Sequence, residues 1–462
     1  MHPRRALGPA LVVVLVAIPV VLWATAAPLG SRFGDLSTSL TNLGVAFGLA
    51  GVSAFAVNLV LGARIAFADW LFGGLDKLFA FHRVNGRVAF ILIAIHALLI
   101  IAGRATTSWD AALDLLSTSG GFVVIYGIVA FIGMAIAIGM TLYRRLSHEV
   151  FIYVQRTFGV IFLIASMHVF MTPGIKASSR PLTIYLTVLL VAGVCAWIYR
   201  SVFGDLLVRR HDYLVTGARR LDRWVVEITM TPKTGKPFTY SPGQFVFVTF
   251  FSNEFEAQFH PVSIEHEGEY AIVTLRPGQI SNQFHPFSLT SAPGEKNLRI
   301  AVKAVGDFTR AMHALAEGAA AKVEGPYGGF SYLKVRRKRQ VWVAGGIGIT
   351  PFLSMVRSMN GTGHQVDLYF GVKSLDQSYF LAELLALDRT KDGFRLIHVP
   401  EDEVGYITAD RIEETTGDLK DVDFLLCGPP PMVQNLRRQL LEKGVARSHI
   451  HFEKFALGQP RS

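Results

Sequence analysis

The sequence predicts a bundle of six membrane-spanning helices followed by an antiparallel β-barrel domain and an α/β domain with a parallel sheet. Residues from about 11 to 203 are dominated by apolar side chains and glycine, whereas the rest of the 462-residue chain has an ordinary soluble charge density. Short alternating segments begin near residue 211, and strands alternate with helical patterns after about 339. The predicted domains are therefore residues 1–205, 206–333 and 334–462.

Charge and cysteine content argue against two common classes of protein. The formal net charge is +10, but the basic residues sit largely beside apolar segments, as cytoplasmic flanks of membrane helices do. Nucleic acid is therefore not an expected partner. The only cysteines, Cys195 and Cys427, are too few and too far apart for a disulfide framework or a Cys₄ iron–sulfur cluster. Any metal must be held by other ligands.

Six apolar segments are each close to the roughly 20 residues that span a hydrocarbon core. Each is predicted to be a helix, because a backbone in lipid finds no other hydrogen-bond partners. The first could also be a signal peptide, since Arg4 and Arg5 precede it, but its apolar run is longer than a usual signal core and favours a retained helix. The segments are residues 11–29, 40–62, 80–102, 121–142, 150–172 and 182–203.

Basic residues in alternate connections predict the orientation of these helices, because such residues favour the cytoplasmic side. Lys176 and Arg180, in an opposite connection, fit this pattern imperfectly. The expectation is a multi-pass protein of the plasma or inner membrane, embedded in the lipid bilayer, with both termini in the cytoplasm. The residues expected on the cytoplasmic side are Arg64, Lys77, Arg83, Arg87, Arg144, Arg145, Arg200, Arg209 and Arg210.

Three histidines in the third and fifth predicted helices are candidate ligands of haem iron. Ionisable side chains at membrane depth usually face a functional interior, and neutral imidazole is a common axial ligand. His82 and His96 lie 14 residues apart, so they share one helix face at a separation of roughly 21 Å. His96 pairs best with His168 of the fifth helix, and glycine-rich helix surfaces leave room for a macrocycle. Each histidine could instead bond a neighbouring helix, and His148 is interpreted as interfacial.

The cytoplasmic half shows two different patterns. Alternating segments at residues 224–228 and 245–248, with turn residues between them, indicate a small antiparallel barrel. Apolar strands at residues 341–344, 366–370 and 423–427 alternate with helical patterns, which indicates a parallel sheet with crossover helices.

The first strand of the parallel sheet leads into a glycine-rich turn. Gly345, Gly346 and Gly348 would let the backbone approach a phosphate, Thr350 can cap the next helix and Pro351 suits its first turn. The positive end of that helix attracts an anion, so a pyrophosphate is expected there. Taken alone, such a turn is often only a tight connection.

The cytoplasmic half resembles the ferredoxin–NADP reductase superfamily, and nearly the whole chain resembles the NADPH oxidase and ferric reductase family. The most specific motif is His-Pro-Phe-Ser-Leu-Thr-Ser-Ala-Pro at residues 285–293, which resembles the family's flavin-binding segment. The resemblance implies that Ser288 contacts the isoalloxazine of FAD. The residues of this segment assigned to FAD are His285, Pro286, Phe287, Ser288, Thr290 and Ser291. Residues 257–264 are similar to 282–289 but lack the continuation, so they are expected to form an extra strand pair.

A second segment after the flavin motif resembles the turn that cradles the FAD pyrophosphate through backbone N–H groups at the start of a helix. It consists of Gly306, Asp307, Phe308 and Thr309. An ordinary capped helix would look the same from the residues alone. Residues 324–328, Glu-Gly-Pro-Tyr-Gly, resemble the close of the barrel.

Two further segments resemble the nicotinamide side of the family's site. Cys427, Gly428 and Pro429 resemble the loop that places a cysteine near the hydride path, although a buried cysteine is more usually packing. Phe455 resembles the aromatic residue that covers the flavin until nicotinamide displaces it. Seven residues follow Phe455, whereas the family's aromatic is commonly terminal.

Two residues after the second parallel strand bear on the choice of nucleotide. Lys373 and Ser374 lie where a 2′-phosphate would sit, which favours NADPH over NADH.

The resemblance implies an oxidoreductase that takes hydride from NADH or NADPH onto FAD and passes single electrons through haem to the opposite membrane face. The haem would be of the b type, because no Cys-x-x-Cys-His motif attaches it covalently. One or two haems and a small-molecule acceptor, oxygen or a ferric chelate, are expected, with no obligate protein partner. The alternatives are a membrane-anchored flavoreductase that serves a soluble partner, and a redox-sensing channel or transporter.

The inner haem is where the sequence departs from this family. The family's inner axial histidine aligns best with Gln155, opposite His82, and an amide is a poor ligand for iron. Loss of this haem would leave roughly 20 Å of helix between the flavin side and the outer haem. The expectation is an inner haem bound by His82, with a weak or absent ligand on the Gln155 side.

Overall fold

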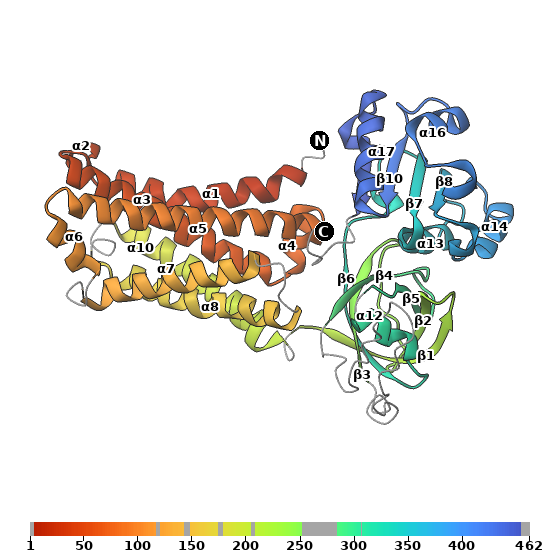
Figure 1. The fold of residues 1–462 in the computed structure, drawn as a ribbon, viewed down its shortest axis with the longest axis horizontal. Helices are drawn as coiled ribbons and strands as arrows, with labels where there is room; N and C mark the ends of the chain where they lie inside the picture. The colour runs from red at the N-terminus through yellow and green to blue at the C-terminus, as the bar shows by residue number, and fades with distance from the viewer. Residues whose placement is uncertain are drawn as a thin grey trace, which may run out of the picture. The chain divides into compact units, whose positions relative to one another are not determined.

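A computed structural model describes residues 4–116, 121–142, 148–173, 179–204, 208–251, 284–305 and 307–453 (Figure 1). It divides into two compact units, of which the first ends at Val208 and the second begins at Arg209. The first unit is helical. The second contains a six-stranded and a five-stranded sheet. The predicted fold class of helical bundle, antiparallel barrel and parallel α/β domain is therefore confirmed.

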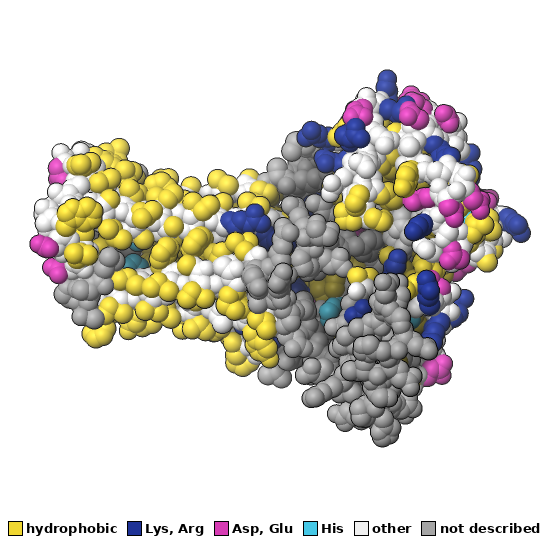
Figure 2. Space-filling model, in the orientation of Figure 1, with side chains coloured by type: hydrophobic (Ala, Val, Ile, Leu, Met, Phe, Trp, Pro, Cys, Tyr) yellow, Lys and Arg dark blue, Asp and Glu magenta, His cyan; other side chains and the backbone are white. Residues whose placement is uncertain are grey.

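Six helices in the described part of the chain are long and apolar enough to cross a membrane. They are α1 (Arg4–Thr25), α3 (Leu36–Gly62), α5 (Leu75–Ala105), α7 (Gly121–Leu142), α8 (His148–Met171) and α10 (Arg180–Trp197), the last continued by the π-helical turn η2 (Ile198–Val202). Large apolar side chains cover their outer surface, among them Leu98 and Phe122 (Figure 2). Such a surface suits lipid, not water.

The first span differs from its predicted bounds. The apolar run suggested residues 11–29, but α1 ends at Thr25 and Pro28 precedes a separate short helix, α2 (Leu29–Arg32). Proline disfavours the helical conformation in the residue before it, which explains the earlier end. Two more short helices lie in connections, namely α4 (Ala66–Phe72) and α6 (Trp109–Leu116).

Glycines on α3 allow a close approach of α5. A Cβ atom on Gly44 would lie 2.9 Å from Ile100, and one on Gly51 would lie 2.7 Å from Ile93. Small residues at helix interfaces let backbones approach closely where lipid supplies no hydrophobic driving force. This contact holds the helix that carries His82 and His96 against α3.

Within the described residues, the barrel contains six antiparallel strands. They are β1 (Arg210–Arg220), β2 (Val225–Pro232), β3 (Phe245–Phe251), β4 (His285–Ser288), β5 (Leu298–Lys303) and β6 (Ala320–Tyr327). Their order is β4-β3-β6-β1-β2-β5, and a bridge between Leu289 and Ile300 joins the two ends of that order. The short helix α12 (Asp307–Ala311) and the 3₁₀ turn η4 (Met312–Ala314) follow β5, and Met312 is buried in the barrel core.

The second sheet is parallel throughout, with the order β11-β10-β7-β8-β9. Its strands are β7 (Arg339–Gly345), β8 (Gln365–Val372), β9 (Phe394–Pro400), β10 (Asp423–Cys427) and β11 (Ile450–Glu453). Its main helices are α13 (Thr350–Arg357), α14 (Leu381–Thr390), α16 (Ala409–Thr416) and α17 (Pro430–Glu442). Helices α13 and α14 pack into one core cluster and α16 and α17 into another, so both faces of the sheet are covered (Figure 1). The strand order reverses between β7 and β10, where such sheets bind ligands.

The barrel and the parallel sheet share a hydrophobic core. Val225 and Ala301 of the barrel belong to the same buried cluster as Trp342 of β7 and Phe352 of α13. Gly243 lies at this contact with a φ of +87°, and a Cβ atom there would come within 2.3 Å of the carbonyl oxygen of Phe330. The second unit is thus a packed pair of domains.

Candidate functional site

Two histidines from different helices meet in the helical unit. The ring centroids of His96 on α5 and His168 on α8 lie 6.2 Å apart. The Nδ1 atom of His96 lies 2.8 Å from the carbonyl oxygen of Gly44, and that of His168 lies 2.7 Å from the carbonyl oxygen of Val123. A carbonyl oxygen only accepts, so Nδ1 carries the proton in both rings and Nε2 of the neutral imidazole keeps its lone pair. Metal-binding histidines typically show this pattern.

Glycines on the facing helices make room for these two rings. A Cβ atom on Gly48 would lie 2.7 Å from Nδ1 of His96, and one on Gly127 would lie 2.9 Å from Nδ1 of His168. From the sequence, the glycine-rich helix surfaces were predicted to leave room for the haem macrocycle. At these two positions the imidazole rings themselves take the space.

The spacing of the two rings fits a shared iron. Two imidazoles that bind one metal through Nε2 from opposite sides, with bonds of about 2 Å, hold their ring centres roughly 6 Å apart. The observed separation of His96 and His168 is 6.2 Å. This separation fits two residues that could hold a haem.

The third histidine has a different environment. Nδ1 of His82 lies 3.1 Å from the carbonyl oxygen of Asn58, so Nε2 again keeps the lone pair, and the ring packs edge-on against Phe79. No ring contact joins His82 to another histidine within the described ranges. Gln155 on α8 is half-buried. The described residues therefore bring no second imidazole to His82.

An amide pair beside His82 was not anticipated from the sequence. Nδ2 of Asn85 donates to the carbonyl oxygen of Ala54 (2.8 Å) and to Oδ1 of Asn58 (3.2 Å). Asn85 is buried, and its two bonds link α5 to α3 one turn from His82. Two asparagines 27 positions apart carry no local pattern that would have revealed this contact.

The predicted flavin segment and the predicted pyrophosphate turn lie side by side on the barrel. The ring of His285 in β4 stacks on Phe308 at a centroid distance of 3.9 Å. The N–H of Val305 donates to Oγ1 of Thr309 (2.9 Å), which closes the turn before α12. Ser288 is buried at the end of β4. Two segments that are 20 residues apart thus form one surface, as a single FAD site requires.

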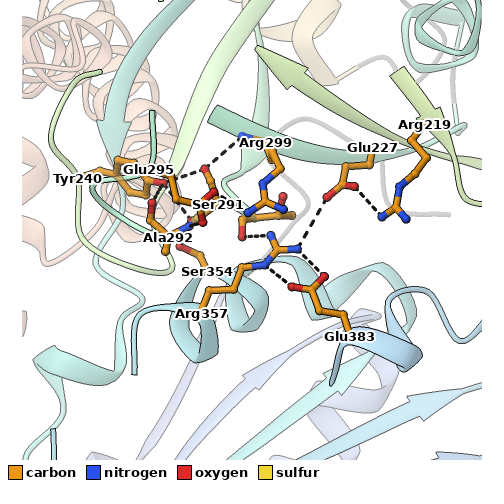
Figure 3. Close-up of polar contacts among 11 residues, drawn as sticks. Arg219, Glu227, Tyr240, Ser291, Ala292, Glu295, Arg299, Ser354, Arg357 and Glu383 are labelled. Carbon is orange, nitrogen blue, oxygen red and sulfur yellow. Dashed lines mark hydrogen bonds and ion pairs between the residues drawn. The ribbon is translucent and has the colours of Figure 1, made fainter. Parts of the chain in front are cut away.

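Thr290 and Ser291 are fully buried in the barrel wall. Figure 3 shows Ser291 beside Tyr240 and Ser354. The hydroxyl of Ser291 lies 2.8 Å from that of Tyr240, and its carbonyl oxygen accepts from Oγ of Ser354 (2.6 Å). Burial raises the pKa of Tyr240, so this hydroxyl stays protonated at neutral pH. In the structure, the backbone carbonyl oxygens of Thr290 and Ser291 accept hydrogen bonds from side chains of α13. Direct contact of these two residues with FAD stays a prediction.

The glycines of the predicted nucleotide turn have different tasks. A Cβ atom on Gly345 would lie 2.7 Å from Met432 at the start of α17, and one on Gly348 would lie 2.3 Å from the carbonyl oxygen of Cys427 at the end of β10. These two glycines therefore serve the packing of the turn against α17 and β10. Gly346 has a φ of +53° and no atom within 4 Å of its Cβ position, so its backbone faces open space where a phosphate could approach.

The predicted cap of the following helix is wrong. The N-cap of α13 is Ile349, and Thr350 is already helical. The Thr350 hydroxyl is buried and donates to the carbonyl oxygen of Ile347 (3.1 Å), and α13 has no side-chain cap at its first turn. The glycine-rich turn coils into the 3₁₀ helix η6 (Gly346–Ile349), which moves the helix start by one residue. Pro351 lies in the first turn, as expected.

Cys427 ends β10 beside the switch point of the sheet. Its side chain is fully buried. Burial raises the pKa of the Cys427 thiol well above its ordinary value, and the negative charge of Glu453 adds to this effect. The thiol is therefore protonated at neutral pH and is not a nucleophile. Gly428 and Pro429, the N-cap of α17, complete this loop, and their contact with nicotinamide stays a prediction.

An acidic residue accompanies the two residues predicted to select the nucleotide. Lys373 is exposed after β8, whereas the Ser374 hydroxyl donates to the carboxylate of Asp376. Asp376 was not predicted from the sequence. The feature that could have identified it is its place just beyond the second strand, where acidic residues bind the ribose hydroxyls of NADH.

A buried ion-pair network joins the two domains of the second unit (Figure 3). Arg357 of α13 binds Glu383 of α14 through two hydrogen bonds of 2.7 Å and donates to the carbonyl oxygen of Thr290 in the barrel. The Tyr379 hydroxyl donates to Asp222 (2.8 Å) at a second point of the interface. These contacts hold the predicted flavin segment against the predicted nucleotide helix.

Several predictions concern residues outside the described ranges. Phe455 and Gly306 are among them, as are the side chain of Asp307 and residues 257–264. They stay predictions, as does the interfacial position of the His148 side chain.

Sequence profiles of three families match the chain in the order of its domains. They are the families described as "Ferric reductase like transmembrane component" at residues 47–166, "FAD-binding domain" at 265–331 and "Oxidoreductase NAD-binding domain" at 342–438.

Individual relatives match about a third of the chain. The chain is 35% identical over 159 residues to NADH-cytochrome b5 reductase 1 of Pyricularia oryzae, a match that covers 32% of this chain and 52% of that protein. It is 27% identical over 179 residues to the reductase component of propane 2-monooxygenase of Rhodococcus jostii, covering 36% and 48%. The chain thus spans about half the length of these curated relatives. A flavohemoglobin structure from Malassezia yamatoensis aligns with 90% of this chain and 97% of its own, at 15% identity and a TM-score of 0.45.

The fold and these matches define a multi-pass membrane oxidoreductase with FAD-binding and NAD-binding domains. A ferric reductase-like transmembrane domain joined to these two modules is the architecture of the NADPH oxidase and ferric reductase family, and this chain has that architecture.

Proposed function

We propose that this protein transfers electrons from cytoplasmic NADH or NADPH, through FAD and b-type haem, to a small-molecule acceptor on the opposite face of the membrane. The observation that carries the proposal is the pairing of His96 and His168, whose Nδ1 atoms both face backbone carbonyls. Two neutral imidazoles with free Nε2 lone pairs at this spacing suit one haem iron.

The bound groups would supply the redox chemistry, since a flavin accepts two electrons as one hydride and gives them up singly to a carrier such as haem. The residues of the chain would hold and orient these groups. The carbonyl oxygens of Gly44 and Val123 orient the two imidazoles, and the stacked rings of His285 and Phe308 join the two segments that would hold FAD. Gly346 leaves its backbone open at the expected nucleotide site.

The acceptor is proposed to be oxygen or a ferric chelate, either of which can react at an outer haem edge. Superoxide formation in air and ferric-chelate reduction under argon, measured on the same preparation, distinguish the two. We further propose a plasma or inner membrane location with both termini in the cytoplasm. Accessibility of tags at the two ends in sealed cells tests this orientation.

The test of the central proposal is an absorption spectrum of the detergent-purified protein before and after NADPH without oxygen. A b-type haem spectrum that becomes reduced is expected. His96→Ala and His168→Ala should each abolish the low-spin signal of the outer haem. Ser166→Ala is the matched control, because Ser166 is buried on α8 near His168 and, among the described residues, its hydroxyl donates to the carbonyl oxygen of Phe162 within the same helix. An unchanged spectrum in both histidine variants would refute the pairing, and flavin without haem would favour the membrane-anchored flavoreductase.

A further inference from the structure

Two asparagines from different membrane spans meet beside His82. Asn58 lies on α3 and Asn85 on α5, and both are inside candidate spans. Asn85 is buried, and its Nδ2 atom donates to Oδ1 of Asn58 (3.2 Å) and to the carbonyl oxygen of Ala54 (2.8 Å). Polar side chains are costly at membrane depth and usually serve a function there. The surroundings of this asparagine pair indicate what that function is.

His82 is bound by the same residue of α3. The Nδ1 atom of His82 donates to the backbone carbonyl oxygen of Asn58 (3.1 Å), whereas Asn85 bonds the Asn58 side chain. His82 and Asn85 are three positions apart on α5, so they lie on one face of that helix. Their three hydrogen bonds all end on residues 54–58 of α3. One turn of α5 is thus fixed to α3, and it is the turn that carries His82.

The asparagine pair lies where a candidate haem ligand has the least other support. Nδ1 of His96 lies 2.8 Å from its carbonyl acceptor and that of His168 lies 2.7 Å from its own, and these two rings are neighbours. For His82 the corresponding distance is 3.1 Å, and the described residues place no second imidazole beside it. A longer hydrogen bond orients a ring less firmly. The asparagine pair therefore adds fixation at the one of these three histidines that needs it most.

Gly86 makes room for the Asn58 amide. A Cβ atom on Gly86 would lie 2.9 Å from Nδ2 of Asn58. A larger residue at this position would therefore push the amide out of its place beside Asn85. Glycine inside a helix costs up to about 1 kcal/mol relative to alanine. The residue directly after Asn85 thus favours the amide contact at the expense of helix stability.

We propose that Asn58 and Asn85 are positioning residues for the inner haem and act through His82. This inference rests on the proposed function, because it takes His82 as the inner axial ligand. Contacts around a metal-binding histidine fix its tautomer and ring orientation, and their loss typically weakens metal binding about 10- to 100-fold. With no imidazole on the Gln155 side, His82 would hold the inner iron alone. Its orientation then has to come from the helix contact beside it.

The test follows haem loss from the full-length, FAD-loaded protein in phosphatidylcholine nanodiscs to an excess of a haem-scavenging apoprotein. The high-spin signal reports the inner haem and the low-spin signal the His96–His168 centre. Asn85→Leu removes both side-chain bonds, so the inner haem should be lost at least about tenfold faster while the low-spin signal persists. Ser37→Ala is the matched control, because Ser37 also joins α3 to α5, through a bond of 2.7 Å to the carbonyl oxygen of Gly103.

Two further variants separate positioning from folding. Gly86→Ala should also speed the loss of the inner haem, because it displaces the Asn58 amide. Since alanine favours a helix over glycine, loss of folding would not explain that result. Asn58→Leu keeps the backbone carbonyl that bonds His82 and leaves Asn85 its bond to Ala54, so it should have a smaller effect than Asn85→Leu.

The possible failures of this inference and of the proposed function are distinct. Parent rates of haem loss in Asn85→Leu and Gly86→Ala would overturn the inference and leave the His96–His168 pairing intact. Equally faster loss of both haems in these variants would also overturn it, because the asparagine pair would then only hold the helices together. One haem per FAD in the parent protein would exclude the inner haem and this inference with it. A parent protein without any haem would refute the proposed function as well.

Discussion

Arg357 and Glu383 form a two-pronged ion pair, with both hydrogen bonds at 2.7 Å. The Arg357 side chain is only 6% exposed, and its remaining nitrogen donates to the carbonyl oxygen of Thr290. One side chain of α13 therefore holds α14 and the segment after β4 together. The geometry of the site between barrel and parallel sheet depends on this residue.

Replacement of Arg357 should destabilise the second unit. Arg357→Met leaves Glu383 and the Thr290 carbonyl without their donor, and the expected loss is about 2–3 kcal/mol of unfolding free energy. The measurement is the temperature at which FAD is released from the full-length protein. Arg438→Met, in the exposed pair with Glu442, is the control and should shift this temperature little. Equal shifts in the two variants would contradict the assigned role.

The same ion pair predicts a dependence on acid pH. Burial favours a higher pKa for Glu383, but hydrogen bonds and the charge of Arg357 outweigh it and hold the pKa below the ordinary 4.5. The stabilisation is therefore complete above 4.5 and is lost as pH falls through the lower native pKa. Glu383→Gln should flatten this loss when FAD release is followed between about pH 6 and 3. A Gln variant with the same acid profile as the parent would exclude Glu383 as the cause.

The inner haem position gives a spectroscopic prediction. Gln155 offers no imidazole opposite His82, so a partly high-spin component is expected beside the low-spin outer haem. Gln155→His should convert that component to low spin without a change in the His96–His168 centre. The measurement is the electron paramagnetic resonance of the oxidised protein. A single haem per FAD that survives His82→Ala unchanged would show that the inner site is empty.

Two hydroxyl residues are expected to act on FAD in different ways. Thr309→Ala removes the acceptor of the Val305 N–H and should loosen the pyrophosphate turn, whereas Ser288→Ala should slow flavin reduction. Retained FAD and the rate of flavin reduction by NADPH are the readouts, with expected effects of about tenfold. Thr249→Val is the control, because Thr249 is fully buried in β3 and its hydroxyl has no partner among the described residues. Normal FAD retention and a normal rate of flavin reduction in both variants would contradict the assignment of Ser288 and Thr309 to the FAD site.

The choice of nucleotide should depend on two opposing charges after β8. Lys373 would attract a 2′-phosphate, while Asp376 would repel it and suits a ribose diol. Asp376→Asn should raise the ratio of kcat/KM for NADPH over NADH about tenfold, and Lys373→Gln should lower it by a similar factor. Unchanged ratios in both variants would place the ribose elsewhere.

The six spans and the two sheets were predictable from sequence because each depends on a local physical constraint. A run of about 20 apolar residues has no stable alternative to a helix in lipid. The barrel and the parallel sheet differ in what joins their strands: turn residues flank the segment at 245–248, whereas the strand at 341–344 is followed by a helical pattern. The glycine-rich turn after β7 was also predictable from sequence, because the backbone freedom that it needs comes from individual glycine residues.

The tertiary structure alone decided how the candidate ligands and cofactor segments are held. Nδ1 of His96 bonds a carbonyl 52 residues away and that of His168 one 45 residues away, so the tautomer of each ring depends on a neighbouring helix. Arg357 reaches Thr290, 67 positions earlier, and no periodic pattern marks that contact. Thr350 looked like a cap, yet the coiling of the turn before it buried the hydroxyl. The sequence determines which side chains are available as ligands or hydrogen-bond partners. Contacts with backbone groups that are distant in the sequence determine how each of these side chains is oriented and which of its atoms carries a proton.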